Sequence, residues 1–113
     1  MRRGEIWTIS GGHYAGQPRP AVIVQDNRFD ATDSITVCGF TTDPIDAPLF
    51  RVVVKPDELN GLRFESRIMA DKVMTIPKTK LGSRLGRLDD KDMARLNRAI
   101  IVFLGFAATR SDS

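Results

Sequence analysis

The sequence has very few of the residues on which several common kinds of site depend. It contains one cysteine, one histidine, one tryptophan and one tyrosine among 113 residues. A lone cysteine, Cys38, excludes a disulfide within the chain, and its apolar surroundings are typical of cysteine used for packing. The usual zinc sites need more cysteine and histidine ligands than Cys38 and His13 supply. We therefore expect no metal ion and no cofactor.

Long apolar segments are missing as well. No run approaches the roughly 20 apolar residues that cross a bilayer, and the opening Met-Arg-Arg-Gly-Glu lacks the apolar core of a secretory signal. These absences predict a cytoplasmic protein without a membrane partner. The length fits one domain, which we place at residues 1–107, followed by a disordered tail at residues 108–113. A core of this size is small for its surface, so a homo-oligomer would add stability.

The charge is mildly basic, with a formal net charge of +3 and a pI of about 9.4. Basic residues are dense between Arg63 and Arg98. Such a stretch indicates either a solvated basic face or a surface for an acidic partner such as nucleic acid.

Short segments rich in β-branched and aromatic residues, separated by turn residues, predict strands. Their ranges are 5–9, 21–24, 35–40, 50–54 and 66–73, and residues 74–76 either extend the last strand or form a sixth. Residues 77–82 predict an irregular or single-turn helical piece. Several short strands at close spacing are typical of a small barrel or curled sheet.

The last apolar segment has the period of a helix instead. Met93, Leu96 and Ile100 recur at helical spacing, Asp89 is placed to cap the N-terminus, and Gly105 is placed to end the helix. The predicted fold class is therefore mainly β, a barrel of five or six strands with one C-terminal α-helix packed on it.

One cation stands out by its setting. Arg19 lies between Pro18 and Pro20 at the mouth of the most apolar strand. The two prolines stiffen the backbone, so a guanidinium held there loses less entropy when it binds a phosphate. The alternative is a surface arginine that binds loop carbonyls.

Other polar residues also fall where a site would form. Thr41 and Thr42 end the third strand, where hydroxyls either orient a phosphate or ribose or make a plain strand-to-loop hydrogen bond. Asp71 lies in an apolar strand, so it is either an acid or base with a shifted pKa or one half of an ion pair. In the first long loop, His13 is able to move protons near neutral pH and Tyr14 to stack on an unpaired base.

Two motifs in this order resemble the MazF/PemK family of toxins. They are Arg-Gly-Glu-Ile-Trp at residues 3–7 and, after a glycine-containing loop, Arg-Pro-Ala-Val-Ile-Val at residues 19–24. Weaker matches follow at the threonines that end the third strand, at Asn-Gly-Leu in residues 60–62, and at Gly-Arg-Leu in residues 86–88. The resemblance covers about residues 2–106.

The resemblance implies an SH3-like barrel of the CcdB/MazF type, a homodimer and a toxin of a type II toxin–antitoxin system. It implies an endoribonuclease that cleaves single-stranded mRNA at short sequences without a metal ion, leaving 2′,3′-cyclic phosphate and 5′-hydroxyl ends. The implied partners are a cognate acidic, MazE-like antitoxin that blocks the RNA groove and operator DNA bound together with it.

The same resemblance assigns residues. The catalytic set is Arg19, Thr41, Asp71 and His13, with either Asp71 or His13 as the base. The expected RNA contacts are Tyr14, Gln17, Phe40, Thr42 and Lys72. The sequence departs from the family where some members carry an arginine two residues before the strand-five carboxylate. Met69 stands there, and Arg67 and Lys72 are the nearby cations.

Two rival functions use the same barrel. One is a CcdB-like toxin that poisons gyrase through a tryptophan-containing end of the C-terminal helix, and this chain has no tryptophan there. The other is a non-catalytic module that only binds an antitoxin and operator DNA, against which the pairing of Arg19 with Thr41 argues.

Overall fold

The computed structural model describes residues 1–10 and 18–107, which form six strands and one α-helix with two short 3-10 turns. The strands are β1 (Glu5–Ile9), β2 (Arg19–Ile23), β3 (Ser34–Thr41), β4 (Arg51–Val54), β5 (Ser66–Pro77) and β6 (Leu81–Arg87). The 3-10 turns are η1 (Asn27–Phe29) and η2 (Lys78–Lys80), and the helix is α1 (Asp90–Phe103).

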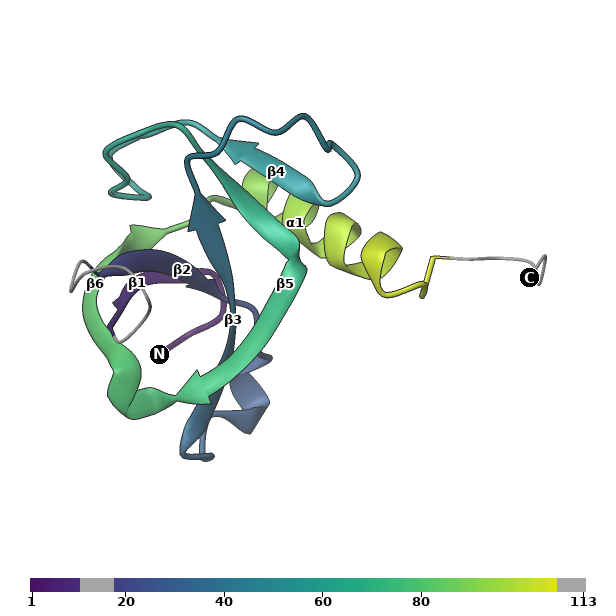
Figure 1. The fold of residues 1–113 in the computed structure, drawn as a ribbon. Coiled ribbons are helices and arrows are strands. Elements are labelled where there is room, and N and C mark those ends of the chain that lie inside the picture. Colours follow the sequence, from purple (N-terminus) through teal and green to yellow (C-terminus); the bar gives the residue numbers. More distant parts are fainter. Residues whose placement is uncertain (11–17, 108–113) are drawn as a thin grey trace.

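The strands make one antiparallel sheet in the order β4-β5-β3-β2-β1-β6. The sheet curls strongly, so that β5 and β6 form opposite sides of an open ring, and α1 crosses the sheet near β4 and β5 (Figure 1). The prediction of a mainly β, barrel-like fold with a C-terminal helix is confirmed.

Both faces of the sheet bury apolar side chains, because successive residues of a strand point to opposite faces. In β3, Cys38 and Phe40 join a core shared with Leu96 of the helix, whereas Ile35 and Val37 join a second cluster inside the curled sheet. This double burial explains why the strands read as continuous apolar runs rather than as alternating ones.

Four of the strands and the helix lie close to their predicted ranges. The segment 66–76 is one continuous strand that extends to Pro77, which decides the alternative left open by the sequence. Asp89 caps the helix by accepting a hydrogen bond from the backbone N–H of Asp92 at 2.7 Å. Gly105 has a left-handed φ of 85°, in keeping with the predicted helix stop.

Residues 77–82 were expected to form an irregular or single-turn helical piece, and η2 is such a turn. Strand β6, which follows at Leu81, was not predicted. Its sequence, Leu-Gly-Ser-Arg-Leu-Gly-Arg, has little β propensity of its own. Pairing with β1 and a close approach to residues 59–61 hold it in place instead. A Cβ on Gly86 would lie 2.2 Å from the carbonyl oxygen of Leu59, so only glycine fits there.

The turn that receives β6 is built around a buried amide. Asn60 is 1% exposed, its Oδ1 accepts hydrogen bonds from the backbone N–H groups of Asp57 and Leu62, and its Nδ2 donates to the carbonyl of Lys55. Gly61 follows with a left-handed φ of 69°. The Asn-Gly-Leu motif is thus the support on which the end of β6 rests.

The predicted tail at residues 108–113 lies outside the described residues. Among the helices of the described chain, none is long and apolar enough to cross a membrane.

Candidate functional site

Thr41 and Arg67 are opposite each other in β3 and β5, and Arg19 lies in β2 at the same end of the sheet. Arg19 and Thr41 each lie two residues beyond the paired Ala21 and Gly39 of β2 and β3, and Thr41 is the register partner of Arg67 in β5. Opposed residues of antiparallel strands share a face and have Cα atoms about 5 Å apart. The side chains of Thr41 and Arg67 therefore share a face, and Arg19 lies at the same end of the neighbouring strand β2.

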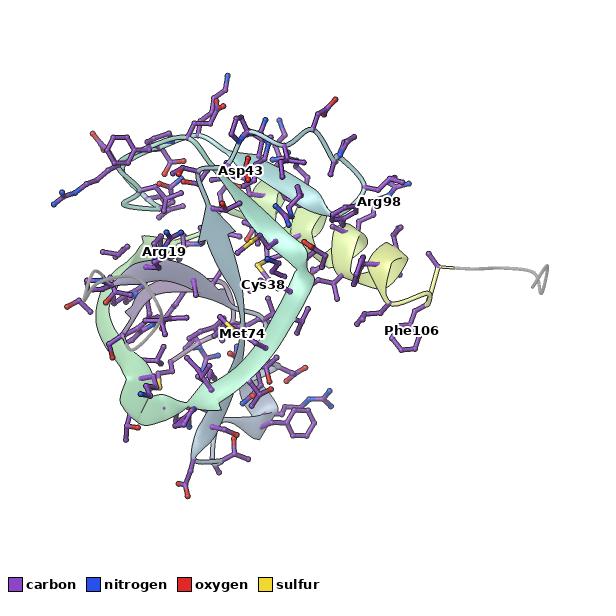
Figure 2. The ribbon with its side chains drawn as sticks, viewed as in Figure 1. Arg19, Cys38, Asp43, Met74, Arg98 and Phe106 are labelled. Carbon is purple, nitrogen blue, oxygen red and sulfur yellow. The ribbon has the colours of Figure 1, made fainter. Side chains whose placement is uncertain are left out.

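Arg19 belongs to β2 itself rather than to the loop before it, because it pairs with Ile9 of β1. Pro20 is also inside the strand, opposite Thr8. Proline is tolerated near the start of a strand, where its missing N–H is least costly. Figure 2 shows Arg19 at this end of the sheet, on the side away from the C-terminal end of α1.

The hydroxyl of Thr41 makes the strand-to-loop hydrogen bond that was one of the two predicted alternatives. Its Oγ1 accepts from the backbone N–H of Asp43 at 3.1 Å. A hydroxyl has one donor and two acceptor sites. The bond to Asp43 therefore orients the hydroxyl and uses only one of its two acceptor sites. Thr42, the next residue, is exposed.

Asp71 is one half of an ion pair. Arg51 of β4 donates to both carboxylate oxygens, from Nε at 2.7 Å and from Nη2 at 3.0 Å, and the two side chains are only 10% and 15% exposed. The hydrogen bonds from Arg51 lower the pKa of Asp71, and the charge of Lys72 adds to the shift. The carboxyl is therefore ionised and oriented at neutral pH.

The charge of Asp71 also reaches the core. Burial, assisted by this charge, raises the pKa of the Cys38 thiol to about 12. Cys38 thus stays protonated and serves packing, as its apolar surroundings predicted.

Arg51 is the residue that the sequence analysis missed. Its register partner in β5 is Met69, the position at which the family resemblance led us to look for an arginine. The cation is therefore supplied from the neighbouring strand, directly across from the expected place, while Lys72 acts on Asp71 through charge alone. The sequence placed Arg51 near the start of a strand. It did not show which strand pairs with that one, so it did not reveal Asp71 as the partner of Arg51.

The prediction of Phe40 as a stacking platform is wrong. Its side chain is 3% exposed and packs in the core with Val52 and Ile68. A ring whose faces are covered is unable to stack on a base. Lys72 is exposed, as a phosphate contact requires.

Three of the predicted site residues, His13, Tyr14 and Gln17, lie outside the described residues. The chain leaves β1 after Ile9 and enters β2 at Arg19, and these two residues are paired. Within residues 1–10 and 18–107, no three histidine, cysteine or acidic residues gather as metal ligands.

One curled antiparallel sheet with a C-terminal helix packed against it defines a small, mainly β protein. Residues 2–104 match the family of PemK-like, MazF-like toxins of type II toxin–antitoxin systems, and the chain belongs to that family.

Relatives and solved structures agree with this assignment. The chain is 52% identical over 108 residues to a probable endoribonuclease MazF of Mycolicibacterium smegmatis, covering 95% of this chain and 99% of the relative. It is 30% identical over 114 residues to endoribonuclease MazF9 of Mycobacterium tuberculosis, covering 92% and 96%. A mycobacterial endoribonuclease solved in complex with its cognate antitoxin superposes with a TM-score of 0.81 at 26% identity, covering 96% and 98%. The chain is accordingly a toxin of the endoribonuclease class.

The Arg51–Asp71 pair predicts a pH-dependent contribution to stability. Because the pKa of Asp71 is lowered in the folded state, this contribution is present above about pH 4 and is lost as the pH falls through the lowered pKa. Asp71→Asn should lower the free energy of unfolding by about 1–3 kcal/mol at pH 7, and the difference from the wild type should shrink below pH 4. Urea unfolding at several pH values measures it.

The matched control is Asp30→Asn, whose ion pair with Lys78 has the acid 49% exposed. An exposed pair contributes about 1 kcal/mol or less. A difference between Asp71→Asn and the wild type that stays constant as the pH is lowered would contradict the assignment.

Proposed function

We propose that this toxin cleaves single-stranded mRNA at short sequences in the cytoplasm, without a metal ion, leaving 2′,3′-cyclic phosphate and 5′-hydroxyl ends. The observation that carries the proposal is that Arg19, Thr41 and Arg67 lie at one end of the sheet, with Thr41 and Arg67 opposite each other. Attack by a ribose 2′-hydroxyl on the adjacent phosphorus concentrates negative charge on the phosphorane oxygens. Fixed cations and an oriented hydroxyl donor are the groups that stabilise such charge.

In this mechanism Arg19 binds the phosphorane, and Thr41 donates to a nonbridging oxygen. Arginine is a poor proton donor because its guanidinium stays protonated in proteins, so Arg19 acts through its charge. Arg67, the register partner of Thr41, supplies a second cation on the far side of the hydroxyl. The proton that leaves the 2′-hydroxyl needs a separate base.

The two candidate bases differ in their state at neutral pH. Asp71 is ionised, but the bidentate contact with Arg51 makes it a weak base. A base works best when its pKa is near the working pH, and histidine meets that condition. We therefore assign the base to His13 and give Asp71 the role of holding Arg51 beside the site.

Unpaired bases would bind along the loop that carries Tyr14 and Gln17, with Thr42 and Lys72 as contacts to ribose and phosphate. Thr42 and Lys72 are both exposed, which supports this role. Because phosphate contacts release counterions, binding of RNA should weaken as the salt concentration rises.

The proposed protein partners are a second copy of the chain and a cognate acidic, MazE-like antitoxin, with operator DNA bound through the antitoxin. The end of α1 supports the homodimer, because it exposes apolar side chains outside the cavity described below, namely Ile101, Phe103, Leu104 and Phe106. Exposed apolar side chains concentrated in one place are typical of protein interfaces. Phe106 projects from this end of the helix in Figure 2.

The nuclease assignment predicts that Arg19→Ala loses activity while the fold persists. Removal of one preorganised donor to the phosphorane should slow cleavage about 10²–10³-fold. The purified protein is incubated with single-stranded RNA in EDTA, and the product ends are examined for cyclic phosphate. Arg28→Ala is the control, since Arg28 is an exposed arginine beyond the other end of β2, where it pairs with Asp26. Full activity in Arg19→Ala would contradict the assignment of Arg19 as the cation that binds the phosphorane.

The choice of base predicts the pH dependence of cleavage. With His13 as the base, kcat/KM should fall between about pH 7 and pH 5, and His13→Gln should remove both the activity and this acid limb. With Asp71 as the base, the rate would stay level down to below about pH 4, because the pKa of Asp71 is lowered. A level profile would transfer the role to Asp71.

The dimer assignment predicts that a charge on the apolar end of α1 separates the copies. Leu104 is 50% exposed in the single chain, so Leu104→Asp should leave the fold intact and shift the sedimentation velocity from dimer to monomer. Thr79→Asp, an exposed residue in η2, serves as the control. An unchanged sedimentation profile for Leu104→Asp would exclude this surface.

A further inference from the structure

A cavity of about 300 Å³ lies between residues 46–49, β4 and α1. Four arginines line it, Arg51, Arg67, Arg95 and Arg98, against one acid, Asp46. Figure 2 shows Arg98 on α1 beside the loop that leads into β4. The remaining lining residues are apolar, so the cavity combines an apolar wall with an excess of positive charge.

The arginines of the cavity differ in how far they are satisfied. Arg51 is held by Asp71, and Arg95 donates to Asp92 and to the carbonyl of Val53. The guanidinium groups of Arg67 and Arg98 make no hydrogen bond or ion pair with any residue in the described part of the chain. Two cations that face one cavity in this way are complementary to carboxylates or phosphates.

Strand β4 is one of the two edge strands of the sheet, so some of its backbone groups face away from the other strands. The backbone N–H of Ala70 in β5 donates to the carbonyl of Phe50. This bond shows which residues of β4 direct their backbone groups toward β5. By alternation, the backbone groups of Arg51 and Val53 point away from β5, toward the open edge. The contact of Arg95 with the Val53 carbonyl on that edge agrees with this phase.

Arg51 and Val53 together direct four backbone groups toward the open edge, an N–H and a carbonyl from each. Two of these four groups already make hydrogen bonds within the chain. The Arg51 N–H donates to the carbonyl of Ala47 at 2.8 Å, and the Val53 carbonyl accepts from Arg95 at 2.8 Å. The Arg51 carbonyl and the Val53 N–H are left. One residue of an added parallel strand bonds to this combination, a carbonyl and an N–H two positions apart.

The lining favours a peptide over RNA. None of the residues that line the cavity is aromatic, whereas sites for single-stranded RNA stack bases on aromatic rings. Phe50 and Phe103, which adjoin lining residues in the sequence, pack against each other with 5.7 Å between their ring centroids. Val52, Ala99 and Val102 form a wall suited to aliphatic side chains.

We propose that the edge of β4 and this cavity dock an extended acidic segment of a partner protein, which adds as a strand and places carboxylates on Arg67 and Arg98. A second copy of the chain fits poorly, since a symmetric contact would set the arginines of one cavity near those of the other. The proposal deepens the antitoxin partnership, and it rests on that part of the proposed function.

The test measures binding of a fluorescein-labelled peptide of alternating glutamate and valine, about six residues long, the usual length of a strand. Fluorescence anisotropy should show saturable, salt-sensitive binding to the full chain and much weaker binding of the peptide with glutamine in place of glutamate. Arg98→Glu should weaken binding at least about tenfold. Lys91→Glu makes the same change of charge on the same helix, outside the cavity, and should have little effect.

A second variant tests the strand edge. Val53→Pro removes only the N–H that faces outward, and proline is tolerated on an edge strand. It should keep the circular dichroism spectrum of the wild type and weaken the peptide about tenfold. Equal binding of the glutamate and glutamine peptides, or equal effects of Arg98→Glu and Lys91→Glu, overturns the proposal.

Two further outcomes would assign the cavity elsewhere and overturn the proposal. One is that a single-stranded RNA oligonucleotide, rather than the peptide, loses affinity in Arg98→Glu. The other is that Arg98→Glu changes the sedimentation of the chain, which would make the cavity an interface between copies. Peptide binding is independent of cleavage. If the wild type binds the peptide without cutting RNA, the nuclease mechanism fails alone, and if it cuts RNA without binding the peptide, only the docking site fails.

Discussion

Strand β5 pairs with β3 over most of its length and with β4 near its start, and its register shifts between the partners of Cys38 and Phe40. This double pairing is the constraint on which the rest of the structure depends. The shift bends the sheet, which lets residues of β5 reach both the inner cluster and the helix side. It also sets Arg67 against Thr41 and brings Asp71 within reach of Arg51.

The electrostatics of the molecule follow from the same strand. Basic side chains are spread through the second half of the sequence, yet the structure divides them into two kinds. Arg51 forms an ion pair with Asp71. Arg67 and Arg98 face a cavity, and neither forms an ion pair with an acidic residue among the described residues. Arg67 stands at both places, since it lines the cavity and opposes Thr41. An acidic segment bound in the cavity would therefore draw a cation away from the proposed phosphate site.

Much of the fold was predictable because its signals are local. Apolar runs of strand length, the change to helical period after Asp89 and the glycine at position 105 each act within a few residues. Strand β6 was not predictable in this way, because its glycine-rich sequence becomes a strand only through pairing with β1 and the tight fit of Gly86 against Leu59. The burial of Phe40 was hidden for a similar reason. An aromatic residue next to two threonines at a strand end gives no sign of which face it occupies.

The sequence by itself determined the fold class, the family and the identity of Arg19 and Thr41 as residues of interest, since these depend on residue types in a fixed order along the chain. The tertiary structure alone decided the partners of those residues. That Arg51 rather than a cation of the same strand holds Asp71, and that Arg67 stands opposite Thr41, are consequences of register between strands distant in sequence. Register is set by the joint burial of both faces and by the bend in β5, which no single segment contains.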